Sequence, residues 1–393
     1  MIRHGWCLNL GAESPMVGQQ IVQFHECFEC VEDPRVRGKC QHPLHSLLFL
    51  ITAAVIAGAD GPTEIEEFGL EKEDWLSEFV DFPEGIPSHD TIGRVLGLIN
   101  PDEFQVAFLE WISQIQTAPS VDGPINVQID GKTARGSYSD AEKTNAIHIV
   151  SAWASTLGVT LGQRRVDSKS NEITAIPEVL DMIDLQGTLV TIDAIGCQKS
   201  IARKIVDGGG DYTFALKDNH PKLCHAVESF FEQTHDNGLS HSKVRSLKQV
   251  EDKRGRVDER FYAVTSIPKG MKPLADQWPD AKSIGQAITI SESQGEQKVE
   301  VRYYLSSRRP KVKEFSQSVR SHWSIESMHW ILDVVFHEDA SRIRTGYAAE
   351  NMSFLRKFIT TILKRDTSRG SMKGKRKRAG WNTRFLEKLL FGK

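Results

Sequence analysis

The sequence predicts a mixed α/β fold, in which helices flank a mixed sheet, preceded by a separate helical domain. Up to about residue 115, apolar residues recur at helical spacing between favourable helix caps. From Ile125 onward, strand-like runs appear, first three in succession and then in alternation with helices. Three successive strands followed by alternating helices and strands are typical of a mixed sheet with helices packed on it. A chain of 393 residues is long enough for two or three domains.

Four helices are expected in the N-terminal domain, which we place at residues 1–118. The apolar run that ends at Ala57 is too short to span a membrane and fits a buried helix. Thr63 is a candidate N-cap, and Pro101 suits the first position of a helix. Two prolines and a glycine in residues 117–124 mark the end of the domain. The expected helices are Leu44–Gly58, Thr63–Leu76, Ser88 or Asp90 to Leu98, and Pro101 to about Ile115.

The second domain, placed at residues 124–364, contains the predicted sheet. Its expected strands are Ile125–Asp130, Ala146–Ala154, Val159–Val166, Thr188–Asp193 and Tyr212–Leu216. Its expected helices are Glu172–Ile183, Gln198–Asp207, Pro221–Gln233 and a final stretch, Ser318–Lys364, divided near Thr345-Gly346. A β-rich insertion at about residues 243–310 interrupts the alternation, with strands expected at Val250–Val264, Ala287–Ser291 and Lys298–Ser306.

Charge is distributed unevenly along the chain. The net charge is −3, but residues 1–120 carry −13 and residues 364–393 carry +9. A basic C-terminal tail, residues 365–393, favours a polyanion such as nucleic acid, although a disordered, solubilising tail has the same composition. The cysteines and histidine at positions 27, 30, 40 and 42 suggest a zinc site, but reduced thiols are the preferred explanation. Without a signal-peptide pattern, the protein is expected in the cytoplasm, associated with the nucleoid when bound to DNA.

Three acidic residues have the placement of a metal-dependent phosphodiester-cleaving centre. Asp130 and Asp193 each end an apolar strand, and Glu326 lies in the final helical stretch. In the predicted topology the strands of the two aspartates are neighbours, about 4.8 Å apart, so both carboxylates can reach one cation. Such oxygen ligands suit Mg²⁺ or Mn²⁺, and two ions can activate a nucleophilic oxygen and stabilise a leaving one.

Each acid has an ordinary structural explanation when taken singly. Asp130-Gly131 is a common turn sequence, and Glu326 fits a solvated helix face. Asp193 is more informative, because functional sites of α/β sheets lie at the carboxyl ends of strands. The combination of three acids with this strand order therefore carries more weight than any one of them.

Several stretches of the chain together resemble a known family. They are Asp33–Arg35, Ala57–Ala59, Ile86–Thr91, Ile129–Ser137, His148–Ala152, Lys169–Ile173, Thr191–Ala194, His322–Glu326 and Leu332–Val334. The chain resembles DDE-type insertion-sequence transposases with a ribonuclease H-like core, in the H-repeat-associated branch found near Rhs elements. The resemblance implies that Asp130, Asp193 and Glu326 are the catalytic, metal-binding acids. It also implies two Mg²⁺ (or Mn²⁺) ions, double-stranded DNA (transposon ends and target) as substrate, and a homodimer on DNA.

The sequence departs from the wider group around the glutamate. The signature Tyr-x₂-Arg-x₃-Glu-x₆-Lys is represented here by Val319, His322, Glu326 and Asp333. His322 and Asp333 share one helical stripe with Glu326, so both are candidate supporting residues. Asp333 either orients a metal-bound water or pairs with a nearby base. Trp323 and Trp330 are expected in the core rather than as base-stacking groups.

Basic residues near the predicted centre and in the tail are candidate DNA contacts. The candidates are Lys132, Arg135, Arg320, Lys373, Lys375, Arg376, Lys377 and Arg378. Glu172 has the simpler explanation of an acid that favours a helix start. The expected function is transposase activity, with DNA strand cleavage at transposon ends and strand transfer into target DNA. Two alternatives remain open: an inactive, repurposed DNA-binding relative, and a ribonuclease H-like nuclease without strand transfer.

Overall fold

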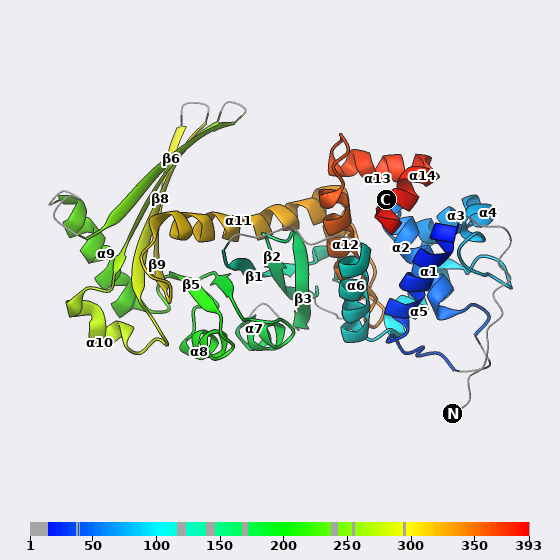
Figure 1. The fold of residues 1–393 in the computed structure, drawn as a ribbon, viewed down its shortest axis with the longest axis horizontal. Helices are drawn as coiled ribbons and strands as arrows, with labels where there is room; N and C mark the ends of the chain where they lie inside the picture. The colour runs from blue at the N-terminus through cyan, green and yellow to red at the C-terminus, as the bar shows by residue number, and fades with distance from the viewer. Residues whose placement is uncertain are drawn as a thin grey trace. The chain divides into compact units, whose positions relative to one another are not determined.

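The computed structural model describes residues 15–36, 38, 40–115, 123–138, 146–166, 172–236, 243–253, 256–293 and 296–392 (Figure 1). Most of the expected linker, residues 117–122, and the stretch Lys169–Asn171 lie outside these residues. The chain divides into two compact units. Residues 119–340 form the first, here called the sheet unit, and residues 1–118 with 341–393 form the second, the helical unit.

The sheet unit is built on a mixed sheet whose first part has the strand order β3-β2-β1-β4-β5. Strands β1, β2 and β3 are antiparallel neighbours, whereas β1, β4 and β5 are parallel. The predicted mixed sheet is therefore confirmed, and its order is that of a ribonuclease H-like core. The strands are β1 (Ile125–Thr133), β2 (His148–Ala154), β3 (Val159–Val166), β4 (Thr188–Ile192) and β5 (Asp211–Leu216).

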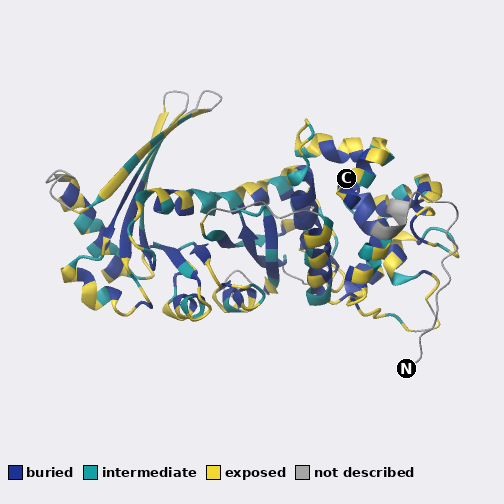
Figure 2. Ribbon diagram, in the orientation of Figure 1, coloured by how far each residue is buried: buried dark blue, intermediate teal, exposed yellow. Residues whose placement is uncertain are grey.

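Helices cover this sheet and bury its apolar side chains. Helices α7 (Glu172–Asp181), α8 (Lys199–Asp207) and α9 (Pro221–Asp236) follow β3, β4 and β5 in the chain. The core includes Val127 and Ile129 of β1, Val190 and Ile192 of β4, and Phe214 of β5. All residues of β2 and β4 are buried, and Figure 2 shows the strands as buried while the helices expose their outer sides. The near-continuous apolar runs of the sequence follow from this coverage on both faces.

The insertion extends the same sheet instead of forming a separate one. Its four strands, β6 (Arg245–Lys253), β7 (Arg256–Ser266), β8 (Ser283–Ser293) and β9 (Glu296–Ser306), follow in the order β5-β9-β8-β7-β6. A 3₁₀ turn (η4, Lys269–Met271) and helix α10 (Lys272–Ala275) connect β7 to β8. The β-rich insertion was predicted, but its three expected strands are wrong in number. The expected strand Val250–Val264 is instead a hairpin of two strands. The break was not predicted because polar residues alternate in the sequence on both sides of the turn.

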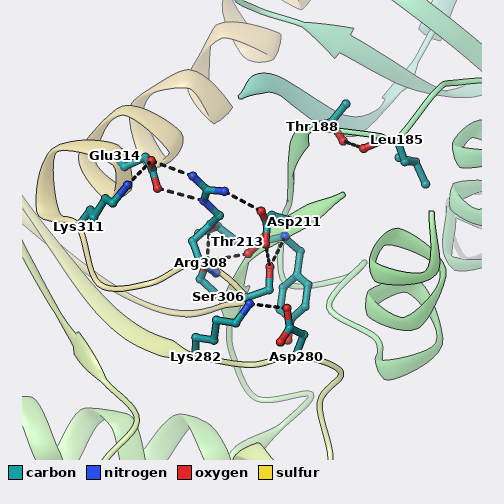
Figure 3. A network of polar contacts seen from close by, with 12 residues as sticks. Leu185, Thr188, Asp211, Thr213, Asp280, Lys282, Ser306, Arg308, Lys311 and Glu314 are labelled. Carbon is teal, nitrogen blue, oxygen red and sulfur yellow. Dashed lines mark hydrogen bonds and ion pairs between the residues drawn. The ribbon is translucent and has the colours of Figure 1, made fainter. Parts of the chain in front are cut away.

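Arg308 joins the end of the insertion to the last helix of the sheet unit, α11 (Val312–Val335) (Figure 3). Its guanidinium lies 2.8 Å from Asp211 Oδ2, at the start of β5, and 2.9 Å from Glu314 Oε1, in the first turn of α11. Both carboxylates raise the pKa of Arg308, and that of Glu314 has the larger effect. The ion pairs fix the start of α11 against β5, and so fix the direction in which α11 runs past β1 and β4.

The helical unit contains the N-terminal helices that the sequence predicted, with three differences, of which the first is the additional helix α1. Its helices before residue 118 are α1 (Pro15–Phe28), α2 (Leu44–Ala57), α3 (Pro62–Glu71), α4 (Glu73–Leu76), α5 (His89–Leu98) and α6 (Pro101–Ile115). Ser88 caps α5 as expected, by accepting a hydrogen bond from Thr91. Thr63 is not the N-cap of α3, because Gly61 caps it and Pro62, with its fixed φ, takes the first position. The expected helix Thr63–Leu76 is broken at Lys72.

Helix α2 is buried from Ser46 to Ile56, as the apolar run predicted. No single described helix is both long and apolar enough to cross a bilayer. Only α2 and α3 taken together, a pair bent by 95°, meet the length and composition of a span.

The C-terminal segment differs from the boundaries expected from the sequence. After a short 3₁₀ turn (η5, Glu338–Ala340), the chain enters the helical unit and forms α12 (Ala348–Arg365), α13 (Met372–Trp381) and α14 (Thr383–Phe391). The compact sheet unit therefore ends near residue 340, so residues 341–364 of the expected domain 124–364 lie in the helical unit, and residues 365–392 are two docked helices rather than a tail. Leu386, Leu389 and Leu390 of α14 are buried, which a disordered tail could not achieve.

Opposite charges within one unit explain this docking. Residues 1–118 carry −13 and residues 341–393 carry +12, so the helical unit is nearly neutral as a whole. Arg376 of α13 pairs with Asp60 at 2.8 Å and is buried. The acidity of the N-terminal helices is thus compensated inside the unit, by a segment distant in sequence.

Candidate active site

The two predicted aspartates lie side by side near the carboxyl ends of the neighbouring strands β1 and β4, although β1 continues to Thr133 instead of ending at Asp130 as expected. Asp130 follows Ile129 in β1, and Asp193 follows Ile192 at the end of β4; Ile129 and Ile192 are paired in the parallel register. Asp193 Oδ1 accepts hydrogen bonds from the backbone N–H of Ile195 (3.1 Å) and Gly196 (3.4 Å), so its carboxylate is held in the turn after β4. The strand ends therefore bring two residues that are 63 positions apart in the sequence next to each other.

Glu326 reaches the same place from α11. This helix packs across β1 and β4. Ser321 and Ser324 on it contact the buried Gln128 of β1, at 3.2 and 3.4 Å. One cavity of about 370 Å³ is lined by all three predicted acids, together with Thr191, Lys217, Arg302 and His322. The structure thus brings Asp130, Asp193 and Glu326 to one cavity.

The three carboxyl groups share an environment that opposes their ionisation. Burial raises the pKa of Asp130 to about 7, and the charges of Asp193, Glu172 and Glu326 add to this effect. Burial also raises the pKa of Asp193, and the charge of Glu172 acts in the same direction. Burial raises the pKa of Glu326, against the positive charge of Arg302. Each acid would ionise more readily beside a cation.

The carboxylate oxygens of the site suit a hard divalent cation, but the three acids are too far apart to bind one ion together. Carboxylate oxygens are the ligands that Mg²⁺ and Mn²⁺ prefer. Among the described residues, no three carboxylate, imidazole or thiol side chains lie close enough to hold one ion together. The residues that would hold a cation are Asp130 and Asp193, with Glu326 completing the set from the helix.

His322 and Asp333, the two residues at altered signature positions, have different surroundings. His322 is half-buried, and its Nδ1 lies 3.2 Å from Thr191 Oγ1. Burial, helped by the charge of Arg302, lowers the pKa of His322 to about 4, so the imidazole is neutral at pH 7. Asp333 does not line the cavity and lies 2.7 Å from Lys132. Of the two roles considered for Asp333, pairing with a nearby base is the one that the structure supports.

Lys132 is therefore not an exposed DNA contact. Its side chain is 9% exposed, and its Nζ also lies 3.2 Å from Glu338 and 3.1 Å from Asp339. The lysine joins β1, two residues after Asp130, to the end of α11 and the turn after it. This role could not be predicted from the sequence, because Glu338 and Asp339 are more than 200 positions away.

Comparisons with known proteins identify the family of this chain. Residues 122–363 match the family model described as "Transposase DDE domain", and residues 25–112 match "DDE_Tnp_1-associated". The chain belongs to the DDE transposase family. It is 43% identical over 366 residues to "Putative transposase YncI" of Escherichia coli O157:H7, covering 92% of each chain.

A second relative defines the branch of this DDE transposase. It is 37% identical to "H repeat-associated putative transposase YhhI" of Escherichia coli strain K12, over 95% of this chain and 99% of that protein. The chain is thus of the H-repeat-associated branch. The solved piggyBac transposase synaptic complex with hairpin DNA aligns with a TM-score of 0.42 and 9% identity, over 95% of this chain and 83% of that one. A likeness this low supports no argument about fold or function.

A buried pair behind Asp130 was missed in the sequence of this transposase. Glu172, the first residue of α7, is buried, and its Oε1 lies 2.7 Å from His148 Nε2. His148 Nδ1 lies 2.8 Å from Thr133 Oγ1 of β1. Glu172 does begin a helix as expected, but its charge also acts on Asp130 and Asp193. The available signal was the predicted strand order, which puts the start of β2 beside the end of β1.

Gly131 makes room for this pair. A Cβ atom at this position would lie 2.6 Å from Glu172 Oε1 and would also overlap His148. Glycine is needed at position 131 because any larger side chain would displace Glu172 or His148.

His329 is a further residue that the sequence analysis did not single out. It lies one turn after Glu326 on α11, and its Nδ1 is 3.7 Å from Asp130 Oδ2. The spacing i, i+3 from a predicted catalytic glutamate was the signal that could have identified it. A protonated His329 would favour the ionised form of Asp130.

The other candidate DNA contacts differ in exposure. Arg135 is exposed, 3.7 Å from Asp339, whereas Arg320 is half-buried and pairs with Glu251 at 2.6 Å. Trp323 lies under Arg302 at 4.1 Å, and Trp330 is 61% exposed, so the core placement expected for Trp330 is wrong. In α13, Lys373, Lys377 and Arg378 are exposed, but Lys375 and Arg376 are buried and cannot reach DNA.

The cysteines of the N-terminal helices show no sign of thiolate chemistry. Burial raises the pKa of Cys27 to about 11 and also raises that of Cys30. The raised pKa of Cys27 makes its thiolate, the form that binds zinc, scarce at pH 7.

Proposed function

We propose that this DDE transposase is active: it cuts DNA strands at the ends of its own element and joins them to target DNA. The observation that carries the proposal is the single cavity lined by Asp130, Asp193 and Glu326. Three carboxylates at one sheet edge suit phosphodiester chemistry, since they concentrate negative charge where divalent cations would screen it. Double-stranded DNA is then both substrate and partner.

The proposed roles of the side chains follow from their positions. Asp130 and Asp193 are fixed by β1 and by the turn after β4, and both would be ligands of the same cation. Glu326 would approach from α11 and complete it. Mg²⁺ or Mn²⁺, when bound, supplies activation of the attacking oxygen and stabilisation of the leaving oxygen. Neutral His322 lines the cavity without adding charge, and His329 lies beside Asp130.

A second candidate function is that of an inactive relative that binds DNA without cutting it. The absence, among the described residues, of three groups close enough to share an ion favours it. The acid at position 333, paired with Lys132 where the wider group has a lysine, favours it as well. The first proposal requires that Asp130, Asp193 and Glu326 move closer together when DNA and metal bind.

The test is product analysis on a plasmid that carries the DNA flanking the coding region on both sides, with Mg²⁺ and a target plasmid. We expect strand breaks at the two ends and joined products. Breaks without joined products would indicate a nuclease, and binding without breaks an inactive relative; either result overturns the proposal. Asp130→Ala, Asp193→Ala and Glu326→Ala should each abolish cleavage and spare binding of the ends. For the expected dimer, light scattering of the protein–DNA complex gives the stoichiometry.

A further inference from the structure

The basic run of α13 has two sides with different surroundings. Lys375, Arg376 and Ala379 face the interior of the helical unit and are buried. Lys373, Lys377 and Arg378 lie on the other side and are exposed. Figure 2 shows this outer side of α13 as exposed. A run that reads as uniformly basic in the sequence is thus divided by the helical period.

The inner side anchors the helix. Lys375 Nζ lies 3.2 Å from Asp366 Oδ2 and donates a hydrogen bond to the carbonyl of Leu363 at 3.0 Å. Arg376 pairs with Asp60 and donates to the carbonyl of Val55 at 3.1 Å. A Cβ atom at Gly380 would lie 2.7 Å from the carbonyl oxygen of Ala57, so α13 approaches the end of α2 closely. These contacts fix which side of α13 faces outward.

The outer side carries positive charge that the described residues leave uncompensated. Lys373, Lys377 and Arg384 (the last from α14) are exposed and form no ion pair with any described residue. Arg378 stacks on Phe385, with 4.0 Å between the guanidinium carbon and the ring centre. Residues 364–393 contain two acids, and both already have partners. Asp366 pairs with Lys375 and Lys388, and Glu387 accepts a hydrogen bond from Trp75.

An exposed aromatic side chain adjoins these cations. Trp381, the last residue of α13, is 79% exposed, more than any other large apolar side chain described. A tryptophan beside several free cations suits a ligand with both phosphates and apolar sugar or base surfaces.

We propose that the outer side of α13 and α14, formed by Lys373, Lys377, Arg378, Trp381 and Arg384, binds the phosphate backbone of duplex DNA. Residues 1–118 of the same unit carry −13, whereas this surface carries only positive charge and is suited to a polyanion. Lys373 and Lys377 are four residues apart and lie about one helical turn from each other. Binding by such cations releases counterions from DNA and makes the affinity strongly dependent on salt. The inference rests on the proposed function only in taking DNA as the ligand.

The test is the salt dependence of binding to a short fluorescent DNA duplex, measured by anisotropy in EDTA, where metal-dependent cleavage cannot contribute. The test variant is K373Q/K377Q/R384Q, which leaves the buried half of α13 intact. The control variant is K222Q/K269Q/K272Q, which removes three exposed lysines of the sheet unit. Thermal unfolding of each variant verifies that the chain is folded.

For the test variant, the slope of log Kd against log salt should fall by about 3, because each substitution removes one cation that neutralises a phosphate. The control should keep the wild-type slope. An unchanged slope in the test variant, or the same reduction in the control, would overturn the proposal. Loss of binding to poly-glutamate with unchanged DNA binding would assign the surface to an acidic protein and overturn it as well. If the wild-type protein does not cleave DNA but the test variant still shows the reduced salt slope, the proposed function is wrong and this inference stands.

Discussion

Replacing Lys132 by alanine is expected to destabilise the sheet unit without a specific effect on DNA binding. Lys132 compensates Asp333, Glu338 and Asp339, which all lie within 3.2 Å of its Nζ. Glu338 is 2% exposed, so it has little access to water once the lysine is gone. The alanine variant therefore removes a positive charge that lies 3.2 Å from a buried carboxylate.

The magnitude follows from the burial of the cluster. Removing one partner of a buried ion pair costs about 3–5 kcal/mol. Asp333 and Asp339 are 34% and 33% exposed and remain hydrated, so the lower end, about 3 kcal/mol, applies. For a unit of this size, 1 kcal/mol corresponds to about 2–4 °C in Tm, so we expect Tm to fall by about 6–12 °C.

Differential scanning calorimetry of the full chain measures this loss of stability, with Lys222→Ala as the control. Lys222 is exposed, and its removal should change Tm by less than about 2 °C. A Lys132→Ala variant with the Tm of the control and a weakened affinity for DNA would refute the reasoning. It would restore the interpretation of Lys132 as a residue that binds phosphate.

Three further predictions concern the same unit. Gly131→Ala forces a methyl group against Glu172 and His148 and should cost about 1–3 kcal/mol in urea unfolding; full stability would contradict the packing described. The pKa of Asp130, about 7 in the fold, is above its unfolded value of about 3.9, so the folded state binds the extra proton and metal-free protein should lose stability as pH rises from 4 to 7. Asp130→Asn should flatten this dependence, and an unaltered pH profile would argue against the raised pKa. Arg308→Ala breaks the ion pairs to Asp211 and Glu314 and should cost about 2 kcal/mol by the same unfolding assay, whereas Arg309→Ala, at an exposed position, should be neutral.

The fold of the sheet unit was largely predictable because its signals are local. The core strands are short runs with many apolar residues, and three such runs in succession predict the antiparallel part of the sheet. Asp130 and Asp193 could be placed together from this order alone. Glu326 could be placed with them only through the resemblance, since nothing in a helix of low amphipathic character indicates which of its sides faces the sheet.

The parts that the sequence did not reveal depend on contacts between distant segments. The burial of Lys132 requires the turn after α11, and the burial of Glu172 requires the side chain of His148 and the missing side chain of Gly131. The docking of α13 requires Asp60, more than 300 positions away. The composition of residues 365–393 does not distinguish a free basic tail from basic helices that pack on an acidic unit and neutralise it.

The central claim is that the carboxylates of Asp130 in β1, Asp193 after β4 and Glu326 on α11 act as one catalytic centre. Its most direct test is the single-turnover rate of end cleavage by Asp193→Asn in Mg²⁺, at saturating protein, with Asp207→Asn as an exposed control. The loss of one member should cost several kcal/mol of transition-state stabilisation, or about a thousandfold or more in rate, while the control cuts at the wild-type rate. Cleavage by Asp193→Asn within a fewfold of wild type would contradict the account.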